Sequence, residues 1–178
     1  MLPGLHTMQP LRIFDLCTGS GCIAISLAKY IENAKVYASD ISEEALKIAQ
    51  INNKNHGTKV NFIKSDLFNN IDIKNFDVIV SNPPYIKTNV IKTLDVEVQN
   101  EPYIALNGGE DGLSFYNKII EDASKYLKPN GYLFLEIGFD QKQEVIDLLN
   151  KNGNYTEIKC IKDLNGLDRI VMCKGDKI

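Results

Sequence analysis

The sequence has no tryptophan, only two histidines, and no apolar stretch long enough to span a bilayer. Its start lacks the charged and then apolar order of a signal peptide, so we expect a cytoplasmic protein. His6 lies near the start, and His56 lies in a polar segment at the expected end of a helix. With histidine this scarce, a Ser-His-Asp or Cys-His catalytic arrangement is disfavoured.

Cysteine is also sparse, with residues at positions 17, 22, 160 and 173 and no Cys-x-x-Cys spacing. These cysteines lie in apolar, strand-like or loop-edge surroundings. We therefore expect reduced thiols in the core, with neither disulfides nor a metal site.

Basic residues are not in excess. The chain has 20 Lys and Arg against 23 Asp and Glu, giving a formal net charge of −3 and a pI near 5.4. This composition gives no electrostatic footprint for nucleic acid, although a local basic patch would be compatible with it. With 178 residues, of which 44% are hydrophobic, the chain is long enough for one domain with a proper core.

Strand and helix patterns alternate along the chain, which is typical of parallel βαβ units. The expected strands are Leu11–Leu16, Lys35–Ser39, Val60–Lys64, Phe76–Val80 and Tyr132–Ile137, and the expected helices are Gly21–Ile31, Ser42–Asn55, Gly112–Leu127 and Gln141–Lys151. Ser42 is expected to cap its helix. The segment Ile86–Gly109 is expected to be irregular.

Two final strands, Tyr155–Ile161 and Arg169–Cys173, are joined by a short polar loop and are expected to pair in antiparallel fashion. The fold class predicted is α/β, a doubly wound and mostly parallel sheet of Rossmann-like type with an antiparallel strand near one edge. No repeat, low-complexity tract or linker interrupts the chain.

Polar residues follow the first four strands, at the sheet edge where ligands bind in such folds. The first strand ends in Asp15 and the glycine loop, the second in Asp40 and the third in Asp66. A Gly-x-Gly loop lets the backbone approach a ligand closely, and an aspartate at the end of the second strand can accept two hydrogen bonds from ribose hydroxyls. Gly19, Gly21 and Ala24 also match the weak dinucleotide pattern G-x-G-x-x-A.

The charge of this edge distinguishes a dinucleotide from a cationic ligand such as S-adenosylmethionine. A pyrophosphate favours helix N–H groups and no nearby anion, whereas Asp15, Asp40 and Asp66 all flank the expected crevice. S-adenosylmethionine carries an ammonium and a sulfonium, which suit three carboxylates, and Asp66 can accept from the adenine amine. The alternative is that each aspartate is only a strand-end cap or loop anchor.

After the fourth strand comes Asn82-Pro83-Pro84-Tyr85, a stiff corner because each proline fixes its own φ and restricts the preceding residue. The Asn82 Oδ1 and the Pro83 carbonyl can both accept hydrogen bonds from one planar NH2 group, and Tyr85 adds an apolar face. The alternative is a rigid turn after a buried strand.

These residues resemble a class I S-adenosylmethionine-dependent methyltransferase that modifies amino nitrogens. More narrowly, they resemble the HemK-type protein-glutamine methyltransferases of peptide chain release factors. The resemblance runs from about residue 11 to 173, and its motifs are Asp15-Leu16-Cys17-Thr18-Gly19-Ser20-Gly21, Asp40, Ser65-Asp66, Val80–Ile86, Glu101-Pro102, Ala105-Leu106, Gly108-Gly109, Asp111-Gly112-Leu113, Leu135–Gly138 and Asp168-Arg169.

The resemblance implies S-adenosylmethionine as cofactor, with the loop around its methionine part, Asp40 at its ribose and Asp66 with Leu67 at its adenine edge. The cofactor-binding residues so implied are Asp15, Cys17, Thr18, Gly19, Ser20, Gly21, Asp40, Ile41, Asp66, Leu67 and Asn82. Asn82, Pro83, Pro84 and Tyr85 would hold the substrate glutamine, and Asn82, Pro83 and Tyr85 would act in catalysis.

The implied chemistry is methylation of a glutamine side chain in an exposed, glycine-flanked loop of a release factor. An amide nitrogen is a poor nucleophile, so hydrogen bonds to Asn82 and Pro83 would orient it and stabilise the developing positive charge. No side-chain base is required. Glu101 and Glu136 are the alternative bases, each with an ion pair or loop anchor as its plainer role.

Two departures from the family pattern matter. Members usually begin with a small helical domain, whereas the first strand here starts within about ten residues of Met1. We therefore expect residues 1–10 to be a leader, either an artificial extension or a remnant of truncation, and residues 11–178 to be the methyltransferase domain. Cys17 also occupies a position where glycine is common, which is expected to constrain the loop.

Two other functions remain open. A nucleic-acid methyltransferase would use the same corner for an adenine or guanine amine, with Tyr85 stacking on a flipped base. It would need a basic surface, but residues 86–110 offer only Lys87 and Lys92 against four acidic residues. A cofactor-binding module without catalysis is the other possibility, and the intact acceptor corner argues against it.

Overall fold

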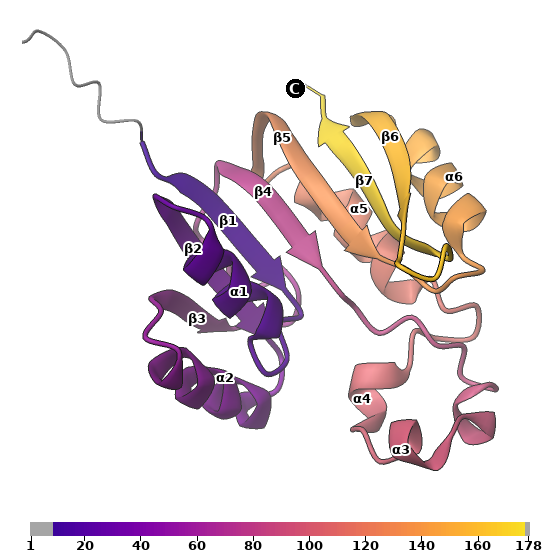
Figure 1. Cartoon of the computed structure of the whole chain (residues 1–178). Coiled ribbons are helices and arrows are strands. Elements are labelled where there is room, and N and C mark those ends of the chain that lie inside the picture. The colour runs from indigo at the N-terminus through magenta and orange to yellow at the C-terminus, as the bar shows by residue number, and fades with distance from the viewer. Residues whose placement is uncertain (1–8, 177–178) are drawn as a thin grey trace, which may run out of the picture.

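The computed structural model describes residues 9–176 as one seven-stranded sheet with helices on both faces (Figure 1). The predicted leader, with His6, lies almost wholly outside the described residues. The strands are β1 Leu11–Leu16, β2 Ala34–Asp40, β3 Val60–Lys64, β4 Phe76–Ser81, β5 Leu127–Glu136, β6 Tyr155–Lys162 and β7 Asp168–Gly175. The main helices are α1 Cys22–Tyr30, α2 Glu43–Asn55, α5 Ser114–Ala123 and α6 Lys142–Asn152.

The strand order is β3-β2-β1-β4-β5-β7-β6, and the first five of these strands pair in parallel. β7 is antiparallel to both β5 and β6, which confirms the predicted doubly wound sheet with an antiparallel strand near one edge. The chain runs outward from β1 to β3 and then crosses back to β4. The order therefore reverses between β1 and β4, where open α/β sheets bind ligands.

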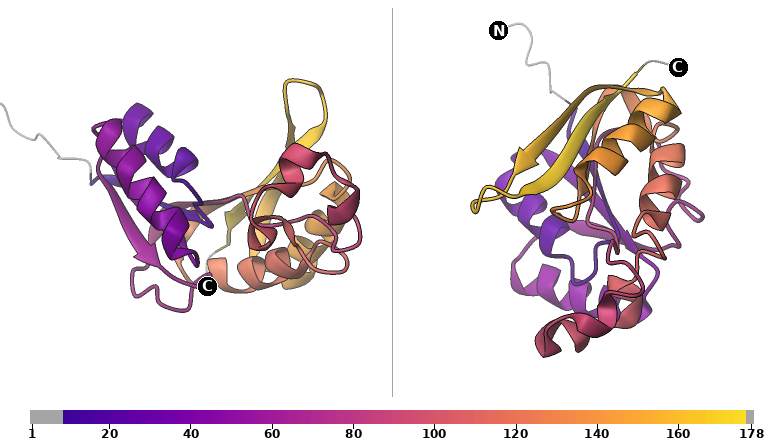
Figure 2. Two further views of the ribbon diagram at one scale, coloured as in Figure 1. Left: turned by 90° about the horizontal axis from the view of Figure 1, so that it is seen from below. Right: turned by 90° about the vertical axis from the view of Figure 1, so that its right-hand side faces the viewer.

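Successive side chains of β1 point to opposite faces of the sheet, and both faces are buried. Phe14 and Leu16 belong to the larger core with α5 and α6, while Ile13 belongs to a second core beneath α1. Figure 2 shows α1 and α2 on one face and α5 and α6 on the other. Helices cover both faces of the central strands. The sequences of β1 and β4 are therefore nearly continuous runs of apolar residues.

Stacked aromatic rings brace the larger core. The rings of Phe14 and Phe76, on the adjacent strands β1 and β4, stack with centroids 4.9 Å apart. Those of Phe68 and Tyr126 stack at 4.5 Å. The first pair joins β1 to β4, and the second joins the segment after β3 to the residue before β5.

Three expectations need correction. The helix expected to reach Leu127 ends at Ala123, and Leu127 instead begins β5, where it pairs with Phe76. Helical spacing placed Leu127 correctly in the core but in the wrong element, because a strand residue can fill the same buried position. The segment expected to be irregular contains the short helices η1 Ile91–Thr93, α3 Val96–Gln99 and α4 Tyr103–Leu106.

The third correction concerns the cysteines. All four are free, as predicted, but only Cys173 is buried. Cys22 is exposed at the start of α1, and Cys17 and Cys160 are half-buried. Among residues 9–176, no helix is long and apolar enough to cross a membrane.

Ser42 caps α2 as predicted, since its Oγ accepts a hydrogen bond from the Ala45 N–H at 3.2 Å. We expect Ser42→Ala to lower the free energy of unfolding by about 1 kcal/mol, because it leaves a helix N–H without its partner. Denaturant unfolding of the ligand-free protein measures this. Ser42→Asn, which retains a capping oxygen, should unfold close to the unmodified protein, and an equal loss in both variants would argue against the cap.

Candidate active site

A cavity of about 650 Å³ lies at the carboxyl ends of β1 to β4. Its floor is the loop after β1, its walls follow β2 and β3, and the corner after β4 faces them. Residues between Val98 and Leu106, in the segment of short helices, line the remaining side. The predicted site residues thus converge at the point where the strand order reverses.

The loop after β1 turns through three left-handed residues, with φ values of 62° at Cys17, 56° at Gly19 and 83° at Gly21. A Cβ on Gly21 would lie 3.0 Å from the Cβ of Ala49, so this glycine permits close packing of α1 on α2. At Gly19 a Cβ would meet nothing within 4 Å. Cys17 holds a conformation that glycine adopts more easily, in line with the expected constraint on the loop.

Asp15 corrects one prediction. It does not line the cavity but lies fully buried beneath the loop, where its Oδ2 accepts hydrogen bonds from the Thr18 hydroxyl at 2.5 Å and the Ala24 N–H at 3.0 Å. Burial raises the pKa of Asp15 to about 7. Its Oδ1 is buried and has no hydrogen-bond partner among the described residues. Asp15 therefore shapes the loop from below and is not one of three carboxylates at the mouth.

Asp40, at the end of β2, lines the cavity. Its Oδ2 accepts from the Gly19 N–H at 2.8 Å, and its Oδ1 accepts from the Ser42 N–H at 2.9 Å. A carboxylate offers about four lone-pair positions, so each oxygen can accept one further hydrogen bond. Asp40 thereby joins the glycine loop to the start of α2 and keeps acceptors for a ligand.

Asp66 and Leu67 form the far wall, directly after β3. Asp66 is exposed, with its Oδ2 3.4 Å from Asn69 Nδ2. Leu67 has a φ of 48°, and the hydroxyl of buried Ser65 donates to its carbonyl at 2.7 Å. This turn presents one acidic and one apolar side chain to the cavity.

The corner after β4 is anchored at its start by Ser81, whose buried hydroxyl donates to the Leu16 carbonyl at 2.7 Å. Asn82 is exposed at the cavity, and Pro83 is buried. Within residues 9–176 no group hydrogen-bonds to the Asn82 carboxamide. Its oxygen is therefore available to a ligand.

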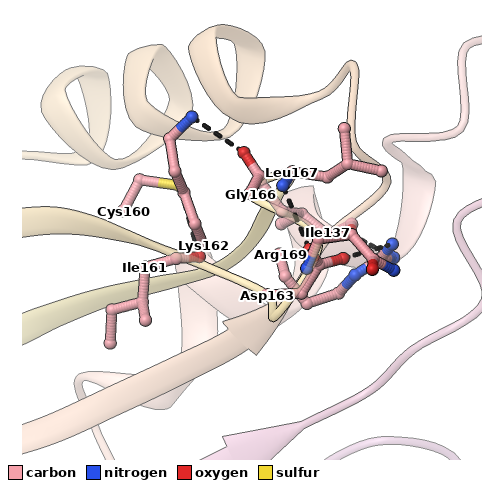
Figure 3. A network of polar contacts seen from close by, with 9 residues as sticks. Ile137, Cys160, Ile161, Lys162, Asp163, Gly166, Leu167 and Arg169 are labelled. Carbon is pink, nitrogen blue, oxygen red and sulfur yellow. Dashed lines mark hydrogen bonds and ion pairs between the residues drawn. The ribbon is translucent and has the colours of Figure 1, made fainter.

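Tyr85 ends the corner, and the charges of Glu136 and Arg169 act on its hydroxyl from distant parts of the chain. Burial raises the pKa of Tyr85, and the negative charge of Glu136 acts in the same direction, while the positive charge of Arg169 opposes it. Arg169 is itself fixed, donating to the Ile137 carbonyl at 3.2 Å and to Asp163 Oδ2 at 3.4 Å (Figure 3). Burial raises the pKa of Glu136, which lies outside the cavity lining.

Most predicted residues line this one cavity: Cys17, Thr18, Gly19, Ser20, Asp40, Ile41, Asp66, Leu67, Asn82, Pro83, Pro84 and Tyr85. Asp15 and Gly21 do not, because they support the loop from beneath. Sequence reasoning missed Phe115 and Lys118, which reach the cavity from α5. Their helical spacing carried no signal that separates a cavity wall from an ordinary helix face.

The sequence profile described as methyltransferase small domain matches residues 1–99, which is more than half of the chain. The chain belongs to this methyltransferase family. The match spans the glycine loop, both wall aspartates and the Asn82 corner, so the whole candidate cavity except its α5 side and part of the short helices lies within it.

Relatives of known name resemble the chain over most of its length. A release factor glutamine methyltransferase of Thermodesulfovibrio yellowstonii is 45% identical over 168 residues, covering 93% of this chain and 60% of that protein. A bifunctional methyltransferase of Rickettsia felis is 48% identical over 164 residues, covering 90% of this chain and 31% of that protein. The chain therefore spans less than two thirds of these relatives.

The fold also matches solved structures. The crystal structure of a methyltransferase from Pyrococcus furiosus superposes with a TM-score of 0.68 at 22% identity, covering 97% of this chain and 79% of that one. At this identity the likeness concerns the fold alone, and it agrees with the class I methyltransferase fold predicted from the sequence.

Proposed function

We propose that this domain transfers a methyl group from S-adenosylmethionine to the side-chain amide nitrogen of a glutamine in a peptide chain release factor. The observation that carries the proposal is the cavity itself. It brings the unoccupied acceptor of Asn82 together with Asp40 and the glycine loop. The names of the relatives support the choice of acceptor protein.

The residues present fit S-adenosylmethionine. Gly19 leaves open space where any side chain would project, so the loop can receive a ligand close to its backbone. Asp40 retains acceptors suited to two ribose hydroxyls, and exposed Asp66 can accept from an adenine amine. The two wall carboxylates suit a cationic ligand. When bound, S-adenosylmethionine supplies an electrophilic methyl group.

In this proposal the corner orients the acceptor. Asn82 Oδ1 and the Pro83 carbonyl each take one N–H of the glutamine amide, which fixes the nitrogen and stabilises the positive charge that develops on it. Pro83 has no N–H of its own, so at this residue the backbone offers the substrate amide a hydrogen-bond acceptor and no donor. The proton of the methylated amide becomes acidic and leaves through these acceptors to water.

A dedicated base is not part of the proposal. Glu136 lies outside the cavity lining, so it has no access to the reacting amide. Glu101 does line the cavity. We assign it to the wall formed by the short helices.

The acceptor is a polypeptide loop, flanked by glycines so that the side chain can enter the narrow corner. Nucleic-acid affinity comes mostly from phosphate neutralisation, whereas this chain has a net charge of −3 and few cations between residues 86 and 110. A protein loop needs no such neutralisation. The proposed setting is the cytoplasm, where release factors act in translation termination.

A parallel labelling experiment tests the function. We expect radiolabel from S-adenosylmethionine to enter a release factor and a glycine-flanked glutamine peptide, but not total nucleic acid, because the negative net charge of the chain disfavours phosphate binding. A peptide with glutamate in place of glutamine is the control and should stay unlabelled. Label in the nucleic acid alone would overturn the acceptor, and no label in any acceptor, with the cofactor bound, would favour a binding module.

A further inference from the structure

Gln141 is a buried amide at the start of α6 that joins three separate segments. Only 3% of its surface is exposed. Its Nε2 donates to the Tyr85 carbonyl at 3.0 Å and to the Gly112 carbonyl at 3.3 Å. Its Oε1 accepts from the Gly138 N–H at 2.9 Å. The side chain thus ties the last residue of the corner to the segment before α5 and to the loop after β5.

The chemistry of this position requires a carboxamide. Two carbonyls must receive hydrogens and one N–H must find an acceptor, all at a buried side chain. A glutamate would present oxygen to both carbonyls, and a lysine or arginine could not accept from Gly138. An apolar side chain would leave the backbone groups of buried Gly112 and Gly138 and the half-buried Tyr85 carbonyl without this partner, which is costly.

Glycines make room for the carboxamide. A Cβ on Gly112 would lie 2.6 Å from Gln141 Nε2, and a Cβ on Gly138 would lie 2.8 Å from Gln141 Oε1. A Cβ on Gly108 would lie 2.7 Å from the Tyr85 Cα. Since real Cβ atoms do not approach so closely, the backbone packs around Gln141 and Tyr85 only because these positions lack side chains.

We infer that Gln141 is a positioning residue for methyl transfer, and the inference rests on the proposed function. Pro83 and Pro84 have fixed φ angles, so few torsions separate Asn82 from the Tyr85 carbonyl. Ser81 holds the corner at its start, and Gln141 holds it at its end. Gln141 thereby fixes the direction of the Asn82 and Pro83 acceptors without contacting the substrate.

The test compares Gln141→Leu and Gln141→Glu with Gln143→Leu. Gln143 is two residues further along α6. It is exposed and, in the part of the chain that the structure describes, its side chain bonds only Asp147, so its replacement controls for the substitution itself. The Glu variant keeps the side-chain length but loses the donors. It also carries the test if the Leu variant does not fold.

We expect single-turnover methyl transfer to a glutamine peptide to fall about 10- to 100-fold in both Gln141 variants, the scale set by small misplacements of positioned groups. The dissociation constant for S-adenosylhomocysteine, measured by calorimetry, should stay within about threefold, because Asp40 and the glycine loop are untouched. Hydrogen–deuterium exchange should rise over residues 85–112, and the Gln143 variant should match the unmodified protein in all three measurements.

The outcomes separate the two proposals. If the unmodified protein does not label the peptide, the proposed function fails, while the exchange measurement still decides whether Gln141 holds the corner. Unchanged transfer and unchanged exchange in both folded Gln141 variants would overturn the inference. Equal losses of transfer and cofactor affinity would also overturn it, since they indicate general destabilisation of the site.

Discussion

Replacing Asn82 with alanine is expected to lower methyl transfer about 10²-fold or more while leaving cofactor affinity nearly unchanged. Removing one oriented group at a developing charge typically costs about 10²- to 10³-fold in rate. The Asn82 carboxamide has no hydrogen-bond partner among residues 9–176, so its loss should not disturb the fold. Single-turnover transfer at saturating S-adenosylmethionine measures the chemical step apart from product release.

The matched control for this prediction is Asn100→Ala. Asn100 ends the short helix α3 and does not line the cavity, so the control variant should transfer at the unmodified rate. An unimpaired rate for Asn82→Ala would show that the corner is only a rigid turn. A reduced rate accompanied by a comparable loss of S-adenosylhomocysteine binding would place Asn82 in cofactor binding instead.

The second large effect is expected from Asp40→Ala, on cofactor binding. A hydrogen bond to a charged group contributes about 1.5–3 kcal/mol, which corresponds to about 10- to 150-fold in the dissociation constant. Asp40 also accepts from the N–H groups of Gly19 and Ser42, so its loss loosens the loop that would surround the ligand. Both effects weaken binding, and calorimetry with S-adenosylhomocysteine measures their sum.

Two companion variants separate these causes. Asp40→Asn keeps the size and one carbonyl oxygen, so it should bind more tightly than Asp40→Ala. Asp72→Ala removes an exposed aspartate outside the cavity and should bind like the unmodified protein. Wild-type affinity in Asp40→Ala, or tighter binding of NAD than of S-adenosylhomocysteine, would contradict the assignment of this wall to S-adenosylmethionine.

The elements that could be predicted are those whose signal is local. Alternation of apolar strands with amphipathic helices predicted the doubly wound sheet, and Ser42 predicted the start of α2. The corner could be found because two prolines after an apolar run end a strand in almost any context. The end of α5 was predicted wrongly, because Leu127 satisfies a helical pattern and yet pairs with Phe76 in the sheet.

The same distinction between local and long-range signals applies to the residues of the site. Short-range patterns set the strand ends, so the amino-acid sequence alone showed which polar residues follow each strand and predicted Asp40, Asp66 and Asn82 at one edge of the sheet. The three-dimensional fold was needed to show that Asp15 is buried beneath the loop, which raises its pKa to about 7. It was also needed to show that Gln141 bonds the carbonyl of Tyr85 across 56 positions of the chain. Burial and long-range hydrogen bonds depend on which segments the folded sheet brings together, and no local pattern encodes that distance.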